Sequence, residues 1–172
     1  MIIRKLFKFE GAHIVRGCTS VRCRENIHGH SYIVEVFVTA NKLDDGYMVM
    51  DFARLSKIKE LVDSFDHSYI LWDKEDKEFK EFVYKYNKRI VEIPVSPSAE
   101  GFALLFLKLS DTIINNMERV NGEGEVQISS VRVHETATGY AEAFRSDLDM
   151  VKFTEADVIY SDAIKEEWKE LN

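Results

Sequence analysis

The sequence is poor in cysteine, in continuous apolar stretches and in basic charge. Its two cysteines, Cys18 and Cys23, are expected to be free thiols, as in a reducing compartment. The apolar runs fall far short of the roughly 20 residues that cross a bilayer, and the N-terminus shows no signal peptide. The net charge of −7 leaves no basic stripe for a general nucleic-acid binder. We therefore expect a cytoplasmic chain with neither a membrane nor a nucleic acid as its partner.

Length and composition indicate one domain. With 172 residues, of which 45% are hydrophobic, the chain can bury a sizeable core but is too short to make two domains the better interpretation. No internal repeat or low-complexity stretch interrupts it. We expect a single domain spanning 1–172, with a charged insertion at 74–94 and an acidic C-terminal extension at 147–172.

Hydrophobic patterning predicts the order strand, strand, helix, helix, strand. The expected strands are 2–9, 31–40, 126–134 and a short one after Gly139. Asp51 is expected to cap a helix whose apolar face runs to Phe65. A serine cap followed by a proline predicts a second helix that begins near Ser96. Within 74–94 a helical spacing precedes a strand-like piece, and a last helix is expected from Ala156 onward.

Three of the five histidines fall within eighteen residues. His28 and His30 are two apart, so on a strand their side chains leave the same face. His13 would arrive from the preceding strand of a hairpin. Three imidazoles leave a metal with its full charge and an open coordination position, whereas structural zinc sites are usually closed by four ligands. The set predicts a catalytic metal site; the alternative is an ordinary pair of polar strand residues.

Two further histidines sit beside carboxylates. Asp66 can accept a hydrogen bond from one ring nitrogen of His67 and raise the basicity of the other, which indicates a proton relay. A charged helix end without a catalytic role is the alternative. His134 and Glu135 are neighbours at a strand end, so only one of them can point into a shared site.

Six motifs, taken in order, resemble the 6-pyruvoyltetrahydropterin synthase and 6-carboxytetrahydropterin synthase family. They are Phe9-x-x-x-His13, His28-Gly29-His30-Ser31-Tyr32, the run 46–52, Asp66-His67, Pro97-Ser98-Ala99-Glu100 and His134-Glu135-Thr136. The likeness covers about 2–143, apart from 74–94. It implies an α+β tunnelling fold, in which a four-stranded antiparallel sheet is backed by two helices. It also implies that subunits close a β-barrel and form a homohexamer, a dimer of trimers, with active sites at subunit interfaces.

The resemblance also implies an activity and a role for each candidate residue. The activity would be a zinc-dependent lyase reaction that converts 7,8-dihydroneopterin triphosphate to 6-carboxy-5,6,7,8-tetrahydropterin, in queuosine and 7-deazaguanine biosynthesis. The implied roles are zinc ligands at His13, His28 and His30, pterin binding by Glu135 and Ser98, and a relay through Asp66 and His67 to a catalytic cysteine.

The catalytic base is where the sequence departs from the family pattern. The usual motif has a cysteine, three intervening residues and then His-Gly-His, whereas here four residues separate Cys23 from His28. Arg24 occupies the place of the cysteine. Glu25 gives Glu-x-x-His-Gly-His instead, which resembles the branch that releases 6-hydroxymethyldihydropterin for folate synthesis. Both Cys23 and Glu25 are candidate bases, and we favour Cys23 because zinc and nearby arginines favour its thiolate. The alternative functions are formation of 6-pyruvoyltetrahydropterin or 6-hydroxymethyldihydropterin, or a non-catalytic zinc- or pterin-binding module.

Overall fold

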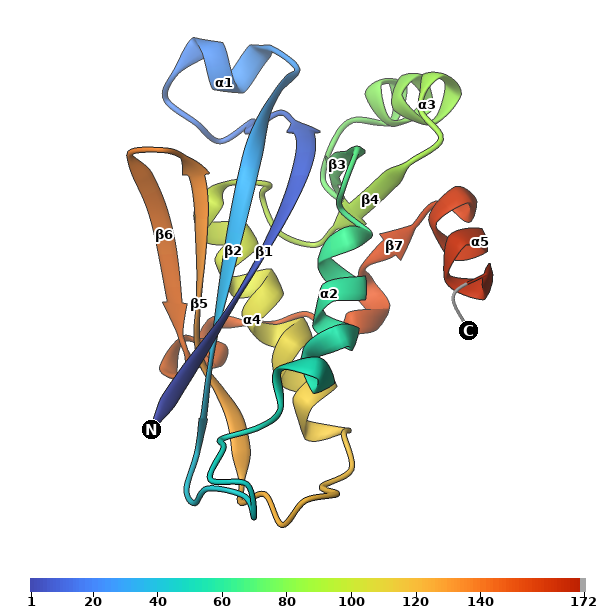
Figure 1. The fold of residues 1–172 in the computed structure, drawn as a ribbon. Helices are drawn as coiled ribbons and strands as arrows, with labels where there is room; N and C mark the ends of the chain where they lie inside the picture. The colour runs from blue at the N-terminus through green and yellow to red at the C-terminus, as the bar shows by residue number, and fades with distance from the viewer. Residues whose placement is uncertain (171–172) are drawn as a thin grey trace.

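A long antiparallel hairpin runs through the centre of the structure, a computed structural model that describes residues 1–170 (Figure 1). Its strands are β1 (Ile2–His13) and β2 (His28–Ala40), which pair without interruption from Ile2 opposite Thr39 to His13 opposite His28. The strands predicted at 2–9 and 31–40 are confirmed, but both are longer than predicted. The added residues carry the histidines, so the ladder itself places His13 beside His28.

The hairpin belongs to a mixed seven-stranded sheet of order β6-β5-β2-β1-β3-β4-β7. On the β2 side lie β5 (Val126–Thr136) and β6 (Gly139–Phe144), both antiparallel and both predicted. On the β1 side, β3 (Ser68–Trp72) and β4 (Ile90–Ile93) add in parallel, and β7 (Ile159–Tyr160) pairs with β4 at the edge. The α+β class is confirmed, whereas a sheet of only four antiparallel strands is wrong.

The difference between the predicted and the observed sheet arises from the short strands on the β1 side. β3 is five residues long and is separated from α2 only by the four-residue turn 64–67, so its short apolar run shows no alternation that separates it from the helix before it. Antiparallel pairing runs through β6-β5-β2-β1 and recurs where β7 pairs with β4, whereas β1 with β3 and β3 with β4 are parallel. In the described chain β6 and β7 are the two edges of an open sheet, so a single subunit forms no closed barrel.

The helix predicted after Asp51 is confirmed. The Asp51 carboxylate accepts a hydrogen bond from the Ala53 amide and starts a short 3-10 turn (Phe52–Leu55), which continues as α2 (Ser56–Asp63). Within α2, Ile58, Leu61 and Val62 are buried, as the apolar spacing predicts.

The second long helix begins later than predicted. α4 (Ala99–Asn115) is capped by Ser98, whose side chain accepts a hydrogen bond from the Gly101 amide at 3.2 Å. A cap at Ser96 is therefore wrong, and Pro97 lies before the helix rather than in its first turn. The spacing alone could not separate the two serines, because either one precedes the apolar run by a plausible distance.

The remaining elements lie in the loops and the C-terminal part. The insertion forms α3 (Lys77–Tyr86) and then β4, in the predicted order. Other short helices are α1 (Val21–Glu25), a 3-10 turn at Arg145–Met150 and another at Glu155–Asp157. α5 (Asp162–Glu170) starts later than the predicted Ala156, because a 3-10 turn and β7 come first. The last two residues of the extension lie outside the described part.

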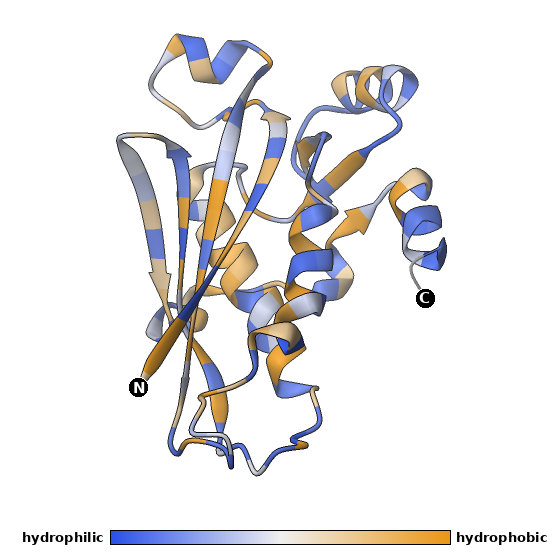
Figure 2. Cartoon of the chain, in the orientation of Figure 1, coloured by the Kyte–Doolittle hydropathy of each residue, from blue (hydrophilic) through white to orange (hydrophobic). Residues whose placement is uncertain are grey.

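The core lies between the sheet and helices α2 and α4, which cover one of its faces (Figures 1 and 2). Phe9 stands at its centre, stacked on Tyr32 with ring centroids 4.6 Å apart. It also contacts Phe65, Phe102 and Phe106, so β1, β2 and α4 meet in one aromatic cluster. Each such buried ring contributes about 1.5–3 kcal/mol relative to an exposed one. Among residues 1–170 no helix combines the length and apolarity that a membrane span requires.

A substitution at Gly29 tests how closely the hairpin packs. A β-carbon on Gly29 would lie 2.9 Å from the Gly11 carbonyl oxygen, a contact with backbone that only a shift of the strands relieves. We expect Gly29→Ala to lower the free energy of unfolding by about 1–3 kcal/mol and to reduce metal binding by the flanking histidines. Urea denaturation measures the first effect. Gly17→Ala is the control, because a β-carbon there meets nothing within 4 Å; equal stability of both variants would contradict the packing argument.

Candidate metal centre

Three histidines converge at the end of the central hairpin. His13 and His28 are opposite each other in the ladder, and His30 lies on the same face two residues along β2. Their ring centroids are 4.5 to 5.3 Å apart. One nitrogen of each ring lies within 4.8 Å of the others, a spacing that could hold a metal ion. The predicted convergence of these side chains is therefore confirmed.

Backbone carbonyls orient two of the three rings. Nδ1 of His13 lies 2.6 Å from the carbonyl oxygen of Pro97, and Nδ1 of His28 lies 2.9 Å from that of Asn26. A ring that donates from Nδ1 keeps the lone pair of Nε2 for a metal, and this second contact fixes the ring's direction. The sequence gives no signal for either partner, because any residue type offers a carbonyl.

The environment keeps His13 neutral. Its side chain is fully buried, and burial lowers its pKa to about 4; the Pro97 hydrogen bond acts in the opposite direction, and His28 and His30 lower the pKa further. Its ring stacks on Phe102 at an interplanar angle of 19°, and the Tyr32 hydroxyl lies 3.3 Å from both of its nitrogens. At neutral pH a metal ion would meet a neutral imidazole, from which no proton has to leave before Nε2 can bind.

A bulge in β5 directs Glu135 toward the histidines. The pairing of β5 with β6 shifts between His134 and Thr136, and such bulges change the direction of a side chain. The carboxylate oxygen of Glu135 lies 3.8 Å from Nε2 of His13 and 3.9 Å from Nε2 of His30. His134 points the other way and bonds to Glu35 at 2.7 Å. Only one of the two neighbours reaches the site, as strand alternation predicts.

The cavity beside the histidines holds one candidate base and not the other. It has a volume of about 300 Å³, and its lining includes Cys23, His28, Ser98 and Glu135. Glu25 is not part of this lining; its side chain is 58% exposed and pairs with Arg24 at 3.0 Å. Both cysteines are free thiols, as expected.

Asp66 and His67 form the expected pair at a different place. His67 Nδ1 lies 2.8 Å from Asp66, whose other oxygen accepts the Glu10 amide at 2.7 Å. Although burial acts to raise the pKa of Asp66, the hydrogen bonds from Glu10 and His67 hold it below its ordinary value. His67 borders a depression lined also by Glu10 and Ser31 but not by Cys23. Within one chain the relay to Cys23 is not assembled.

The hairpin, the open three-histidine centre and the facing carboxylate define an α+β protein built around a potential metal site. The chain belongs to the 6-pyruvoyl tetrahydropterin synthase family, whose model matches residues 2–146.

Curated relatives agree with this assignment. The chain is 46% identical over 154 residues to a 6-carboxy-5,6,7,8-tetrahydropterin synthase of Helicobacter pylori strain J99, covering 89% of this chain and 77% of that protein. It is 34% identical over 158 residues to the synthase of the same name from Aquifex aeolicus, covering 81% and 95%.

Solved structures share the fold. An uncharacterized protein from Wolinella succinogenes superposes with a TM-score of 0.66 at 22% identity. The Plasmodium vivax 6-pyruvoyltetrahydropterin synthase superposes with a TM-score of 0.58, also at 22% identity. Both alignments cover 84% of this chain and 98% of the other.

Loss of one histidine should remove the metal. We expect about one zinc ion per chain in the native protein and a large loss of zinc in His28→Ala, because two imidazoles alone bind zinc weakly at this open site. Elemental analysis after dialysis measures the content. His134→Ala is the matched control, since that ring points away toward Glu35 and should leave zinc in place. A fully loaded His28→Ala protein would refute the ligand assignment.

Proposed function

We propose that this protein is a zinc-dependent lyase that converts 7,8-dihydroneopterin triphosphate to 6-carboxy-5,6,7,8-tetrahydropterin in queuosine biosynthesis. The relatives that carry this activity in their names support the reaction. The observation that carries the proposal is the meeting of His28, Glu135 and Cys23 at one cavity beside His13 and His30. A ligand group, a carboxylate and a thiol together make a reaction site rather than a structural metal site.

The histidine set fits zinc. Nε2 of His13 and of His28 is left for a metal by the carbonyl contacts of Nδ1, and no fourth protein ligand of the thiolate type closes the group among the described residues. When bound, zinc would supply positive charge that acidifies hydroxyl groups of the substrate side chain.

Glu135 and Ser98 are suited to hold the pterin ring. A carboxylate can accept two parallel hydrogen bonds, from a ring N–H and from the exocyclic amine. The Glu135 side chain is 30% exposed, so it can meet a ligand that enters the cavity. Ser98 already accepts the Gly101 amide, which leaves its hydroxyl proton available for a ring acceptor.

Cys23 is the base that the geometry favours. Cys23 lies on α1 and lines the cavity together with His28. The Glu25 carboxylate is paired with Arg24, and Glu25 is not part of that lining. In this role the thiolate would take a proton from substrate and return it, with His67 as the exchange partner.

Glu25 defines a second candidate function. One of the solved Plasmodium vivax structures is of a variant in which a catalytic glutamate is replaced by alanine, so a catalytic glutamate occurs in a protein of this fold. If Glu25 turns inward when substrate binds, the product would be 6-hydroxymethyldihydropterin.

Association of subunits would complete the relay. The edge strand β6 exposes Tyr140 and Phe144, and an unpaired edge of this kind is a template for another chain. We propose a homohexamer, a dimer of trimers with closed barrels, in which the Asp66-His67 pair of one subunit meets Cys23 of another. In this arrangement, the Asp66-His67 pair that forms within one chain would serve the Cys23 thiol of a neighbouring chain, because its own Cys23 lines a different cavity.

Product analysis distinguishes the two bases. We expect Cys23→Ala to lose about 100-fold or more of the rate at which 6-carboxytetrahydropterin forms, with zinc still bound. Cys18→Ala is the matched control and should remain active: Cys18 lines the same cavity, but its sulfur accepts the Ser20 amide within the loop. Chromatography of the products of native protein, Cys23→Ala, Cys18→Ala and Glu25→Ala measures this. If the Cys23→Ala protein is fully active and the Glu25→Ala protein is inactive, the catalytic base is Glu25 and not Cys23.

Mixed assemblies test the shared site. Cys23→Ala and His67→Ala subunits should each be weakly active alone, and should regain activity when they are dissociated, mixed and reassembled, because some interfaces then pair an intact thiol with an intact histidine. Each variant reassembled by itself is the control, and sedimentation reports the oligomer. Mixed hexamers that stay inactive, or an active monomer, would contradict the interface model.

A further inference from the structure

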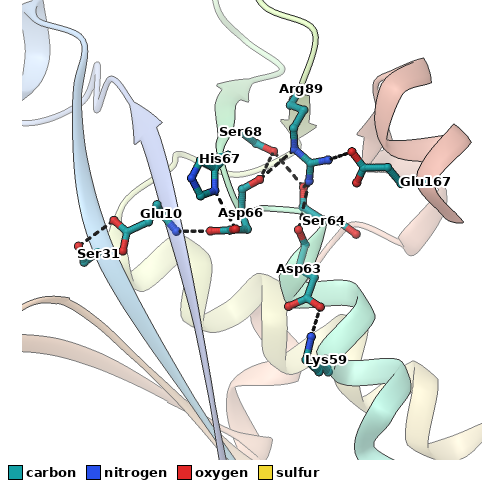
Figure 3. A network of polar contacts seen from close by, with 10 residues as sticks. All are labelled: Glu10, Ser31, Lys59, Asp63, Ser64, Asp66, His67, Ser68, Arg89 and Glu167. Carbon is teal, nitrogen blue, oxygen red and sulfur yellow. Dashed lines mark hydrogen bonds and ion pairs between the residues drawn. The ribbon is translucent and has the colours of Figure 1, made fainter. Parts of the chain in front are cut away.

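Arg89 joins three separate parts of the chain at the turn that carries Asp66 and His67 (Figure 3). Its Nε donates to the carbonyl oxygen of Asp66 at 3.0 Å, and Nη2 donates to that of Asp63 at 3.2 Å. These carbonyls lie at the end of α2 and in the turn after it, where helix carbonyls lack partners within the helix. A cation at this end is also favoured by the helix dipole.

The turn needs such support because of its backbone conformation. His67 has a φ of +54°, in the left-handed region that residues with a β-carbon rarely adopt. On the side of β1, the His67 amide donates to the Glu10 carbonyl at 2.7 Å, and the Glu10 amide donates to the Asp66 carboxylate. Arg89 holds the same turn from the opposite side (Figure 3).

The C-terminal helix reaches this point as well. Glu167 of α5 forms an ion pair with Nη1 of Arg89, and Trp168 donates from its indole nitrogen to the Ser64 hydroxyl at 3.2 Å. The segment before α5 is anchored to the insertion, since the Ser161 amide donates to the Ile90 carbonyl and the Ser161 hydroxyl accepts the Ile90 amide. The insertion and the extension therefore meet under the Asp66-His67 turn.

The His67 side chain depends on that turn for its direction. It is 74% exposed, and its ring is held by the hydrogen bond to Asp66. Little packing surrounds the imidazole, so the backbone beneath it decides where the ring points. A change that loosens Asp66 also changes the direction of His67.

We propose that Arg89, held by Glu167, is a positioning residue that fixes the direction of the His67 imidazole. The insertion and the C-terminal helix then act as a support for this histidine. The inference rests on the proposed function for its effect on turnover, but not for its effect on His67 itself.

Four variants test the proposal in the full-length protein: Glu167→Gln, Arg89→Lys, Arg89→Ala and the double variant Arg89→Ala/Glu167→Gln. The control is Glu166→Gln, the same change at the exposed neighbour on α5, which forms no ion pair with any residue of 1–170. One readout is the rate at which diethylpyrocarbonate modifies His67, followed by peptide mass spectrometry. The other is turnover of dihydroneopterin triphosphate, separated into kcat and KM, with zinc content and thermal midpoint recorded.

We expect a graded loss of kcat with KM and zinc content unchanged. Glu167→Gln should lower kcat about twofold to threefold and Arg89→Ala about tenfold, with Arg89→Lys between them. The His67 modification rate should change in the same order, while Glu166→Gln matches the native protein. In the Arg89→Ala background, Glu167→Gln should cause no further fall of kcat, because Glu167 acts through the Arg89 guanidinium.

Two results would overturn the proposal. One is a native His67 modification rate in Arg89→Lys and Glu167→Gln, both of which retain most of the local packing. The other is an equal fall of kcat in Glu166→Gln, which would indicate a general effect of α5 charge. If the native protein shows no turnover, the proposed function fails, and the His67 modification rates still decide the role of Arg89.

Discussion

The register of the central hairpin is the constraint on which the site depends. Phe7 and Phe9 of β1 and Tyr32 and Val34 of β2 are buried, and by strand alternation they share a face with His13, His28 and His30, of which His13 is buried. A slip of one residue would turn both the core side chains and the histidines to the other face. The free energy that buries the aromatic cluster therefore also holds the three rings together.

Much of this arrangement follows from local patterns in the sequence. The strand period of two predicts that Glu135 and His134 point to opposite faces and that His28 and His30 share one face. The Asp51 cap could be predicted for a similar reason, since a carboxylate before an apolar helical face has a specific hydrogen-bonding use.

Other features depend on contacts between distant segments, which leave no local pattern. The Pro97 carbonyl that orients His13 is 84 residues away in the sequence, and nothing in its residue type identifies it. The parallel strand β3 and the two-residue β7 are too short for a periodic signal. Likewise, the sequence identifies Asp66 and His67 as candidate site residues. It cannot show that, within one chain, His67 and Cys23 line two different depressions.

The short helix α1, which carries Cys23, contains no buried residue and contributes nothing to the core. Its length and register are therefore not constrained by the packing that constrains β1 and β2. A residue can be gained or lost between the thiol and the His-Gly-His run without altering the hairpin. Evolution can thus exchange one proton-transfer group for another on this loop while the ligand framework stays as it is, and different reaction outcomes become accessible to a single scaffold.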